Sequence, residues 1–164
     1  MADGSKETGF FAALERRCAL VDSLLCVGLD PHPQDIGAGG PQAALEFCLS
    51  VVEQTRDVAA AFKPNAAFFE VHGAEGWEAL RTLIAEIGDV PVVLDAKRGD
   101  IGSTSAAYAK ACYEHLGVRC VTVQPYLGWE AIEPFLSDRS ASVFALCRTT
   151  NPGADRLQEA ELLS

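Results

Sequence analysis

The chain has 164 residues, of which 49% are hydrophobic and 22% are charged, and this balance is typical of one globular domain with a buried core. Its net charge of -10 argues against a nucleic-acid-binding surface, because phosphate backbones are bound by concentrations of Lys and Arg. No apolar stretch approaches the roughly 18–20 residues of a membrane span, and the N-terminus lacks the apolar core of a signal peptide. We therefore expect a cytoplasmic protein that contacts neither nucleic acid nor a membrane.

The six cysteines are scattered through the chain without a C-x-x-C pair. Most of them lie in apolar runs, which predicts buried free thiols rather than a disulfide framework. Cys112 and His115 form a C-x-x-H pair whose second half is missing, so no metal site is expected.

Five short apolar runs rich in Val, Leu and Phe are predicted to be strands buried on both faces. They are residues 24–30, 61–65, 90–96, 120–126 and 142–150. Helical patterns of 3.6-residue period lie between them and after the last one. The residues that define these helices are Leu45, Cys48, Leu49, Val52 and Ala59; Trp77, Leu80, Ile84 and Ile87, ending at Gly88; Ala109, Cys112 and Leu116, between caps at 103–105 and Gly117; then 129–136 and 156–163.

This β-α alternation predicts a parallel sheet, because each strand needs a helical crossover to return the chain. Two architectures fit it: an open doubly wound sheet, or a (β/α)₈ TIM barrel of which only the first five βα units are present. Polar residues close nearly every strand, as in the catalytic face of a barrel, and these residues are Asp30, Lys63, Asp95, Lys97, Gln124 and Thr150. No phosphate-binding glycine motif follows the first strand, which also favours the barrel.

Four charged side chains are expected to converge at the ends of the second and third strands. Side chains alternate along a strand, so Asp95 and Lys97 should point to the same side. Lys63 ends the neighbouring strand, and Asp100 follows in the loop. A structural salt-bridge network is the alternative, but burying such charges is costly and their strand-end placement favours a functional site.

The segment from Asp95 to Ile101 resembles the D-x-K-x-x-D-I signature of the orotidine 5'-phosphate decarboxylase family. Other segments resemble its bacterial (type 2) branch: LCVGLDPHP (25–33), FKPNAAFFE (62–70), LDAKRGDIGSTSAAYA (94–109), VQPYLG (123–128) and CRTTNPGA (147–154). D-x-K-x-x-D alone is shared with hexulose-phosphate synthases, whereas its combination with F-K-P-N and R-T-[ST]-N-P-G is highly specific.

The resemblance implies a carboxy-lyase that converts orotidine 5'-phosphate (OMP) to uridine 5'-phosphate (UMP) and CO₂ in de novo pyrimidine biosynthesis, with no cofactor. Lys97 then matches the lysine that stabilises the carbanion at pyrimidine C6 and protonates it. Asp95 matches the carboxylate beside the leaving carboxylate, and Lys63 the lysine that holds Asp95 and a ribose hydroxyl. Asp30 matches the aspartate that accepts a hydrogen bond from the ribose, and Asn65 joins the substrate-binding set.

The resemblance also implies a homodimer whose active sites are shared between subunits. Asp100 matches the aspartate that enters the partner's site, accompanied by Ile101 and Thr104. Thr150 matches the hydroxyl residue that reads the pyrimidine amide, where many relatives have serine.

A complete barrel needs roughly 250 residues, so residues 1–164 are expected to form a partial barrel domain without the last three βα units. Those units carry the family's phosphate-binding groups, and the chain alone is therefore expected to be inactive. The alternatives are a hexulose-phosphate synthase-like metal-dependent lyase with Glu70 in its site, a Schiff-base aldolase using Lys63 or Lys97, and a non-catalytic dimerisation or folding fragment.

Overall fold

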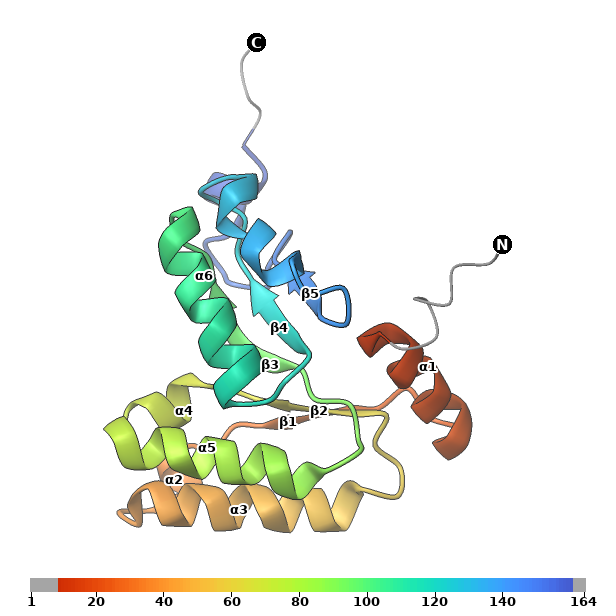
Figure 1. Cartoon of the computed structure of the whole chain (residues 1–164). Helices are drawn as coiled ribbons and strands as arrows, with labels where there is room; N and C mark the ends of the chain where they lie inside the picture. The colour runs from red at the N-terminus through yellow and green to blue at the C-terminus, as the bar shows by residue number, and fades with distance from the viewer. Residues whose placement is uncertain (1–8, 161–164) are drawn as a thin grey trace.

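Five parallel strands follow one another through the chain in a computed structural model, which describes residues 9–160 (Figure 1). The strands are β1 (Cys26–Leu29), β2 (Ala61–Pro64), β3 (Leu94–Arg98), β4 (Cys120–Val123) and β5 (Ser142–Ala145). β1 pairs with β2, and β3, β4 and β5 pair in that order. Isolated parallel bridges from Phe62 to Val92 and from Asn65 to Asp95 join the two groups. The strand order therefore equals the chain order.

This order decides between the two predicted architectures. A doubly wound sheet reverses its strand order at a switch point, whereas a barrel adds each strand beside the previous one. The main helices cover the outer side of the curved sheet (Figure 1). The chain therefore has the fold of the first five βα units of a (β/α)₈ barrel, as the sequence predicts.

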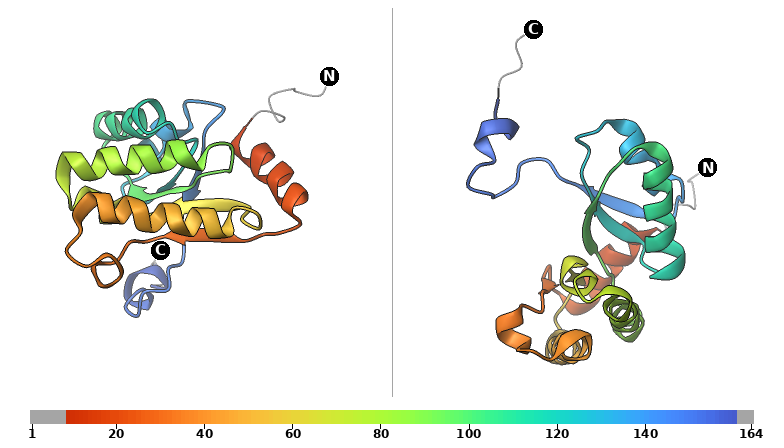
Figure 2. Two further views of the ribbon diagram at one scale, coloured as in Figure 1. Left: turned by 90° about the horizontal axis from the view of Figure 1, so that it is seen from below. Right: turned by 90° about the vertical axis from the view of Figure 1, so that its left-hand side faces the viewer.

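The helices lie between the strands with one addition at the start. They are α1 (Phe10–Val21), α2 (Pro33–Ile36), α3 (Gly40–Thr55), α4 (Ala67–Glu70), α5 (Gly73–Ile87), α6 (Gly102–Lys110) and α7 (Asp155–Gln158), with a π-helical turn η2 (Ala111–His115) and the 3₁₀ turns η3 (Trp129–Ala131) and η4 (Glu133–Leu136). α3 and α5 lie side by side over β1 and β2, as the left view of Figure 2 shows.

The main core lies between these helices and the outer face of the sheet. Its largest fully buried side chains include Phe62 of β2, Leu94 of β3 and Leu80 of α5. Burying such a side chain contributes roughly 1.5–3 kcal/mol. The same packing that stabilises the fold therefore fixes where β2 and β3 end, and hence where the charged residues after them lie.

Helix α1 lies at the end of the sheet where the strands begin (Figure 1). Arg17 holds it there by donating hydrogen bonds to the carbonyls of Ala59, at 3.0 Å, and Arg56, at 2.5 Å. The sequence patterns did not predict this helix, nor the short helices α2 and α4.

Several predicted boundaries were wrong. All five strands exist, but they are shorter than predicted, and β3 starts four residues later than residue 90. Ala59 is buried but lies beyond the end of α3. Ile101, rather than the 103–105 segment, is the N-cap of α6, and Gly117 follows a π-turn instead of a regular helix end. Residues 129–136 form two 3₁₀ turns, and the last part of the predicted 156–163 helix lies outside the described residues.

The cysteines are all free, as predicted, but only Cys48, Cys112 and Cys120 are buried. Cys26 and Cys147 are exposed, so the prediction of buried thiols was wrong for these two. Within residues 9–160, no helix combines the length and the apolar character that a membrane crossing requires.

We expect Gly76→Ala to destabilise the fold by about 1–3 kcal/mol. A Cβ at this position of α5 would lie 1.8 Å from the backbone carbonyl oxygen of Phe69, which cannot move aside without shifting α4. Gly102→Ala is the matched control at the start of α6, since its Cβ would meet no atom closer than 3.9 Å. Urea unfolding of both variants measures the difference, and equal midpoints would contradict the close packing of α4 on α5.

Candidate active site

A carboxylate held between two ammonium groups lies where β2 and β3 end. Asp95 receives a hydrogen bond from Lys63 Nζ at 2.9 Å on Oδ2 and one from Lys97 Nζ at 2.5 Å on Oδ1. The Asp95 side chain is only 10% exposed, whereas those of Lys63 and Lys97 are 35% and 51% exposed. The predicted convergence is therefore confirmed for three of the four charged residues, Lys63, Asp95 and Lys97, and both cations remain accessible to a ligand.

Asp30 and Asn65 form a second polar pair beside the first. Asp30 follows β1 and accepts a hydrogen bond from Asn65 Nδ2 at 3.0 Å. The Asp30 carboxylate is also close enough to act on the charge of Lys63. The strand-end residues of β1, β2 and β3 thus form one continuous polar surface.

Lys97 reaches Asp95 by a different route from the predicted strand alternation. Its backbone has a φ of 47°, which is in the left-handed region and uncommon for a residue other than glycine. Leu94 pairs with Val121 and Arg98 with Val123, so β3 bulges out of register between these two pairs. The predicted contact is correct, but a β-bulge rather than a regular strand produces it.

Thr122 lies opposite this bulge on β4, and the sequence interpretation missed it. Its hydroxyl donates to Asp95 Oδ1 at 2.9 Å and accepts from the amides of Ala96, at 3.0 Å, and Lys97, at 2.9 Å. All four residues of β4 are buried. A hydroxyl within an otherwise apolar buried strand needs hydrogen-bond partners, and that was the signal available in the sequence.

The array stabilises the charged forms of Asp95 and Lys63. Burial acts to raise the pKa of Asp95, but hydrogen bonds from Lys97, Lys63 and Thr122 outweigh it and hold that pKa below its ordinary value. Burial acts to lower the pKa of Lys63, but the hydrogen bond and charge of Asp95 outweigh it and raise that pKa. Both shifts keep a carboxylate beside an ammonium group at neutral pH.

These shifts predict how stability depends on pH. The Asp95 contribution is present above the ordinary aspartate pKa of 3.8 and is lost as the pH falls through the lowered value in the folded state. The Lys63 contribution is present below the ordinary lysine pKa of 10.5 and is lost as the pH rises through its raised value.

We therefore expect the difference in unfolding temperature between the wild type and Asp95→Asn to shrink as the pH falls below 3.8. Lys63→Met should approach the wild type only at the alkaline end, above 10.5. Thermal unfolding followed by circular dichroism across the pH range measures both differences. A difference that does not vary with pH would show that these charges do not stabilise the fold.

Asp100, the fourth charged residue that was predicted to converge, forms no hydrogen bond or ion pair with the other three among the described residues, so that part of the prediction was wrong within one chain. The Asp100 carboxylate accepts a hydrogen bond from the amide of Ile101 at 2.7 Å, and Ile101 is 61% exposed. Thr104 is half-buried in the first turn of α6. Thr150 lies five residues beyond the end of β5, in an exposed loop, so the expectation that it closes the fifth strand was wrong.

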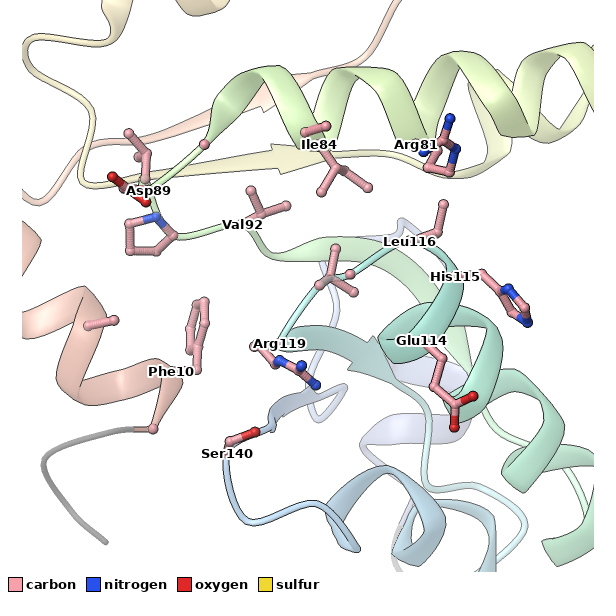
Figure 3. Close-up of a pocket in the computed structure, with 18 residues that line it drawn as sticks. Phe10, Arg81, Ile84, Asp89, Val92, Glu114, His115, Leu116, Arg119 and Ser140 are labelled. Atoms are coloured by element: carbon pink, nitrogen blue, oxygen red, sulfur yellow. The ribbon is translucent and has the colours of Figure 1, made fainter. Parts of the chain in front are cut away.

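A cavity of about 530 Å³ lies at the opposite end of the strands (Figure 3). It is lined by Phe10 of α1, Ile84 of α5, Val92 and the Leu116–Arg119 segment before β4. In barrels the end where strands begin carries stability, whereas reacting groups gather where strands finish. The Asp95 array, rather than this cavity, is therefore the candidate active site.

Among residues 9–160, no group of three or more His, Cys, Asp or Glu side chains is arranged to hold a metal ion. Glu70, the acid that a metal-dependent rival would use, is ion-paired with Arg98 instead. The fold and the site together define a partial barrel with a Lys-Asp-Lys array at the end where its strands finish.

Comparison with known proteins agrees with this class. A model of the orotidine 5'-phosphate decarboxylase / HUMPS family matches residues 23–163, and the chain belongs to this family. It is 47% identical over 156 residues to the orotidine 5'-phosphate decarboxylase of Roseiflexus castenholzii, covering 93% of this chain and 57% of that protein. The decarboxylase of Paracidovorax citrulli is 46% identical over 160 residues, covering 94% of this chain and 58% of the relative.

The solved structures agree in fold. The orotidine-monophosphate decarboxylase of Toxoplasma gondii superposes with a TM-score of 0.92 at 42% identity, covering 98% of this chain and 55% of that one. Leishmania donovani UMP synthase gives a TM-score of 0.87 at 46% identity, covering 94% of this chain and 34% of that one. The chain spans about half the length of the curated relatives it matches.

Proposed function

We propose that the protein carrying this chain decarboxylates OMP to UMP and CO₂. The observation that supports this most strongly is the Asp95 carboxylate, which bonds one ammonium group through each of its oxygens at the strand ends. Loss of CO₂ leaves an electron pair on C6 of the pyrimidine that the ring cannot delocalise. A fixed cation beside that carbon is the group that stabilises it.

Lys97 supplies the cation and the proton in this proposal. The bond between C6 and the carboxylate breaks, its electron pair stays on C6, and a proton from Lys97 Nζ forms the new C–H bond. Asp95 keeps the two ammonium groups in place and lies beside the leaving carboxylate. Lys63 and the pair of Asp30 and Asn65 bind the ribose hydroxyls, and Thr150 reads the pyrimidine.

A metal-dependent lyase of the hexulose-phosphate synthase kind is the second candidate, since the matching family model spans both groups. Against it stand the names of the curated relatives, which are decarboxylases at 47% and 49% identity, and the pairing of Glu70 with Arg98. A Schiff-base aldolase needs an uncharged lysine, and Asp95 opposes that at Lys63 by raising its pKa, while Lys97 is ion-paired with the same carboxylate.

The test uses two proteins: the 164-residue chain and a "completed chain", in which the C-terminal part of the R. castenholzii decarboxylase beyond the matched region follows it. Each is offered OMP, and separately ribulose 5-phosphate together with formaldehyde, with and without Mg²⁺. The proposal expects UMP only from the completed chain, because binding the remote phosphate drives catalysis at the ring. Circular dichroism verifies that each protein is folded. A folded completed chain that forms no UMP from OMP contradicts the proposal, and so does one that converts ribulose 5-phosphate only when metal is present.

We further propose a cytoplasmic homodimer in which residues 1–164 contribute one partial barrel domain and Asp100, Ile101 and Thr104 enter the partner's site. Two observations support this arrangement. The Asp100 carboxylate bonds its own chain's Ile101 amide rather than Lys63 or Lys97. Ile101, Tyr126 and Trp129 are exposed apolar side chains on the loops that follow β3 and β4. A non-catalytic fragment would share this surface but not the activity.

Shared sites predict recovery of activity on mixing two inactive completed chains, Lys97→Met and Asp100→Asn. A hybrid dimer has one site with both defects and one with none, so equal mixing should restore about a quarter of wild-type turnover. UMP formation before and after mixing measures this. Two Lys97→Met preparations mixed in the same way serve as the control, and no recovery in exchanging dimers would place Asp100 outside the partner's site.

A further inference from the structure

Thr122 is a polar residue in the middle of the buried strand β4. Its hydroxyl forms hydrogen bonds with three groups of β3: the amides of Ala96 and Lys97 and the carboxylate of Asp95. No element other than β4 provides a hydroxyl to this part of β3 among the described hydrogen bonds. The one hydroxyl therefore bonds both the β3 backbone and the Asp95 carboxylate of the array.

The chemistry of a hydroxyl fixes the direction of these bonds. It has one proton to donate and two lone pairs to accept with. Both amides can only donate, so Ala96 and Lys97 occupy the two lone pairs. The one proton must then go to Asp95 Oδ1, which is the oxygen that Lys97 Nζ also bonds. Any rotation of the hydroxyl breaks at least one of the three bonds.

The bulge explains why these amides need a side-chain acceptor. Between Leu94 and Arg98 the chain advances four residues on β3, while from Val121 to Val123 it advances two on β4. A bulge disrupts the ladder of carbonyls that such amides would bond, and the part-buried amides of Ala96 and Lys97 donate to the Thr122 hydroxyl instead. Lys97 in addition holds a φ of 47°, which costs energy in a residue with a side chain.

The two sides of the bulge are held by other groups. After the bulge, the backbone N–H of Gln124 donates to the Arg98 carbonyl at 2.8 Å, and its side-chain Nε2 donates to the Gly99 carbonyl at 3.2 Å. Before it, the Asp95 carbonyl accepts a hydrogen bond from the amide of Ala66 at 3.1 Å. The middle, which contains Lys97, depends on Thr122.

We propose that Thr122 is a positioning residue that holds Lys97 in its left-handed conformation and orients Asp95, and so aims the Lys97 ammonium at the reacting carbon. This role rests on the proposed decarboxylase function for its effect on rate, but its structural part is independent of the substrate. Displacement of a reacting group by about 1 Å can lower a rate by about 100-fold. Thr122 never touches the substrate in this account.

The test compares three variants. Thr122→Val keeps the shape and removes the hydroxyl, Thr122→Ser keeps the hydroxyl and removes the methyl group, and Thr82→Val is the matched control on α5. Thr82 also donates its hydroxyl to a carbonyl, that of Glu78 at 3.0 Å, but far from the array in the fold. If Thr122→Val does not fold, Thr122→Cys, with its weaker hydrogen-bonding thiol, takes its place in both measurements below.

The first measurement is OMP turnover by completed chains as a function of pH. Thr122→Val should lower kcat about 10- to 100-fold with KM changed less than about threefold, and its acidic limb should move to higher pH. Thr122→Ser should stay within about threefold of the wild type, as should Thr82→Val. A Thr122→Val enzyme that is less stable but keeps its kcat and its acidic limb overturns the proposal.

The second measurement needs no substrate and therefore separates the two proposals. Carbon-13 NMR of the Asp95 carboxyl in the 164-residue chain follows its titration. Loss of the Thr122 donor should move that titration to higher pH in Thr122→Val and leave it in place in Thr122→Ser. An Asp95 titration that is unchanged in Thr122→Val overturns the positioning role, whatever the enzyme does. The predicted shift together with an inactive wild type would instead retain Thr122's role and reject the proposed reaction.

Discussion

Replacing Lys97 with methionine in the completed chain is expected to lower the rate of OMP decarboxylation at least about 1000-fold. Methionine keeps the length of the side chain but removes both the cation that faces the carbanion and the proton that quenches it. Lys63 cannot replace it, because its Nζ bonds the other oxygen of Asp95, at 2.9 Å, from the neighbouring strand. UMP formation under saturating OMP measures the loss.

Lys110→Met is the matched control for this prediction. Lys110 ends α6, is largely exposed and forms only a loose pair with Glu114 at 3.8 Å. Its replacement should leave turnover within about twofold, since isolated surface pairs contribute little. Equal losses in the two variants would remove Lys97 from the reaction, and so would a Lys97→Met enzyme with near-normal turnover.

Replacing Asp95 with asparagine is expected to lower kcat/KM at least about 100-fold. Asparagine has the same shape, but it cannot bond an ammonium group with each of two charged oxygens. Lys63 and Lys97 would then face each other without the carboxylate between them, and their repulsion would turn the Lys97 ammonium away from the substrate. Turnover of the completed chain, with folding followed by circular dichroism, measures the effect.

Asp138→Asn provides the comparison, because Asp138 is also an ion-paired carboxylate but lies on the surface, 3.1 Å from Arg119. We expect it to leave kcat/KM unchanged. If Asp95→Asn behaved in the same way while remaining folded, the Lys-Asp-Lys array would be a structural salt bridge rather than part of a catalytic site.

Apolar strands followed by charged residues made the barrel and the contact of Lys63, Asp95 and Lys97 predictable from sequence. Parallel strands bring their final residues to one edge of a sheet. The polar residues at the ends of β1, β2 and β3 therefore lie close together as expected, and Asp30 accepts a hydrogen bond from Asn65. Burial on both faces, which the runs of Val, Leu and Phe predicted, holds for β2 and β4 but was wrong for β1 and β5, which are partly exposed.

The bulge at Lys97 could not be predicted in the same way. Strand alternation assumes one residue of β3 for each residue of β4. The sequence Asp95-Ala-Lys-Arg98 contains no pattern that predicts a positive φ at Lys97. The hydroxyl of Thr122 in an apolar strand indicated that it needs partners, but which groups it bonds could not be predicted, because they meet it only opposite the bulge. Thr150 was placed too close to β5, because the apolar run 142–150 continues past the last paired residue, Ala145.

The sequence interpretation missed helix α1, in which Phe10 is the one buried residue. Its position depends on Arg17 reaching carbonyls 39 and 42 residues away, which local patterns do not contain. The predicted end of α6 was wrong because the π-turn η2 follows it, and there the number of residues per turn differs from that of a regular helix.

The measurement that tests the account most directly is decarboxylation of OMP by the completed chain in D₂O. If Lys97 protonates C6, its exchanged ammonium group delivers deuterium, so NMR of the UMP formed should show one deuterium at C6 and one CO₂ released per UMP. Lys97→Met should form no such product. A folded completed chain that yields no UMP, or UMP that carries hydrogen at C6, would contradict the account.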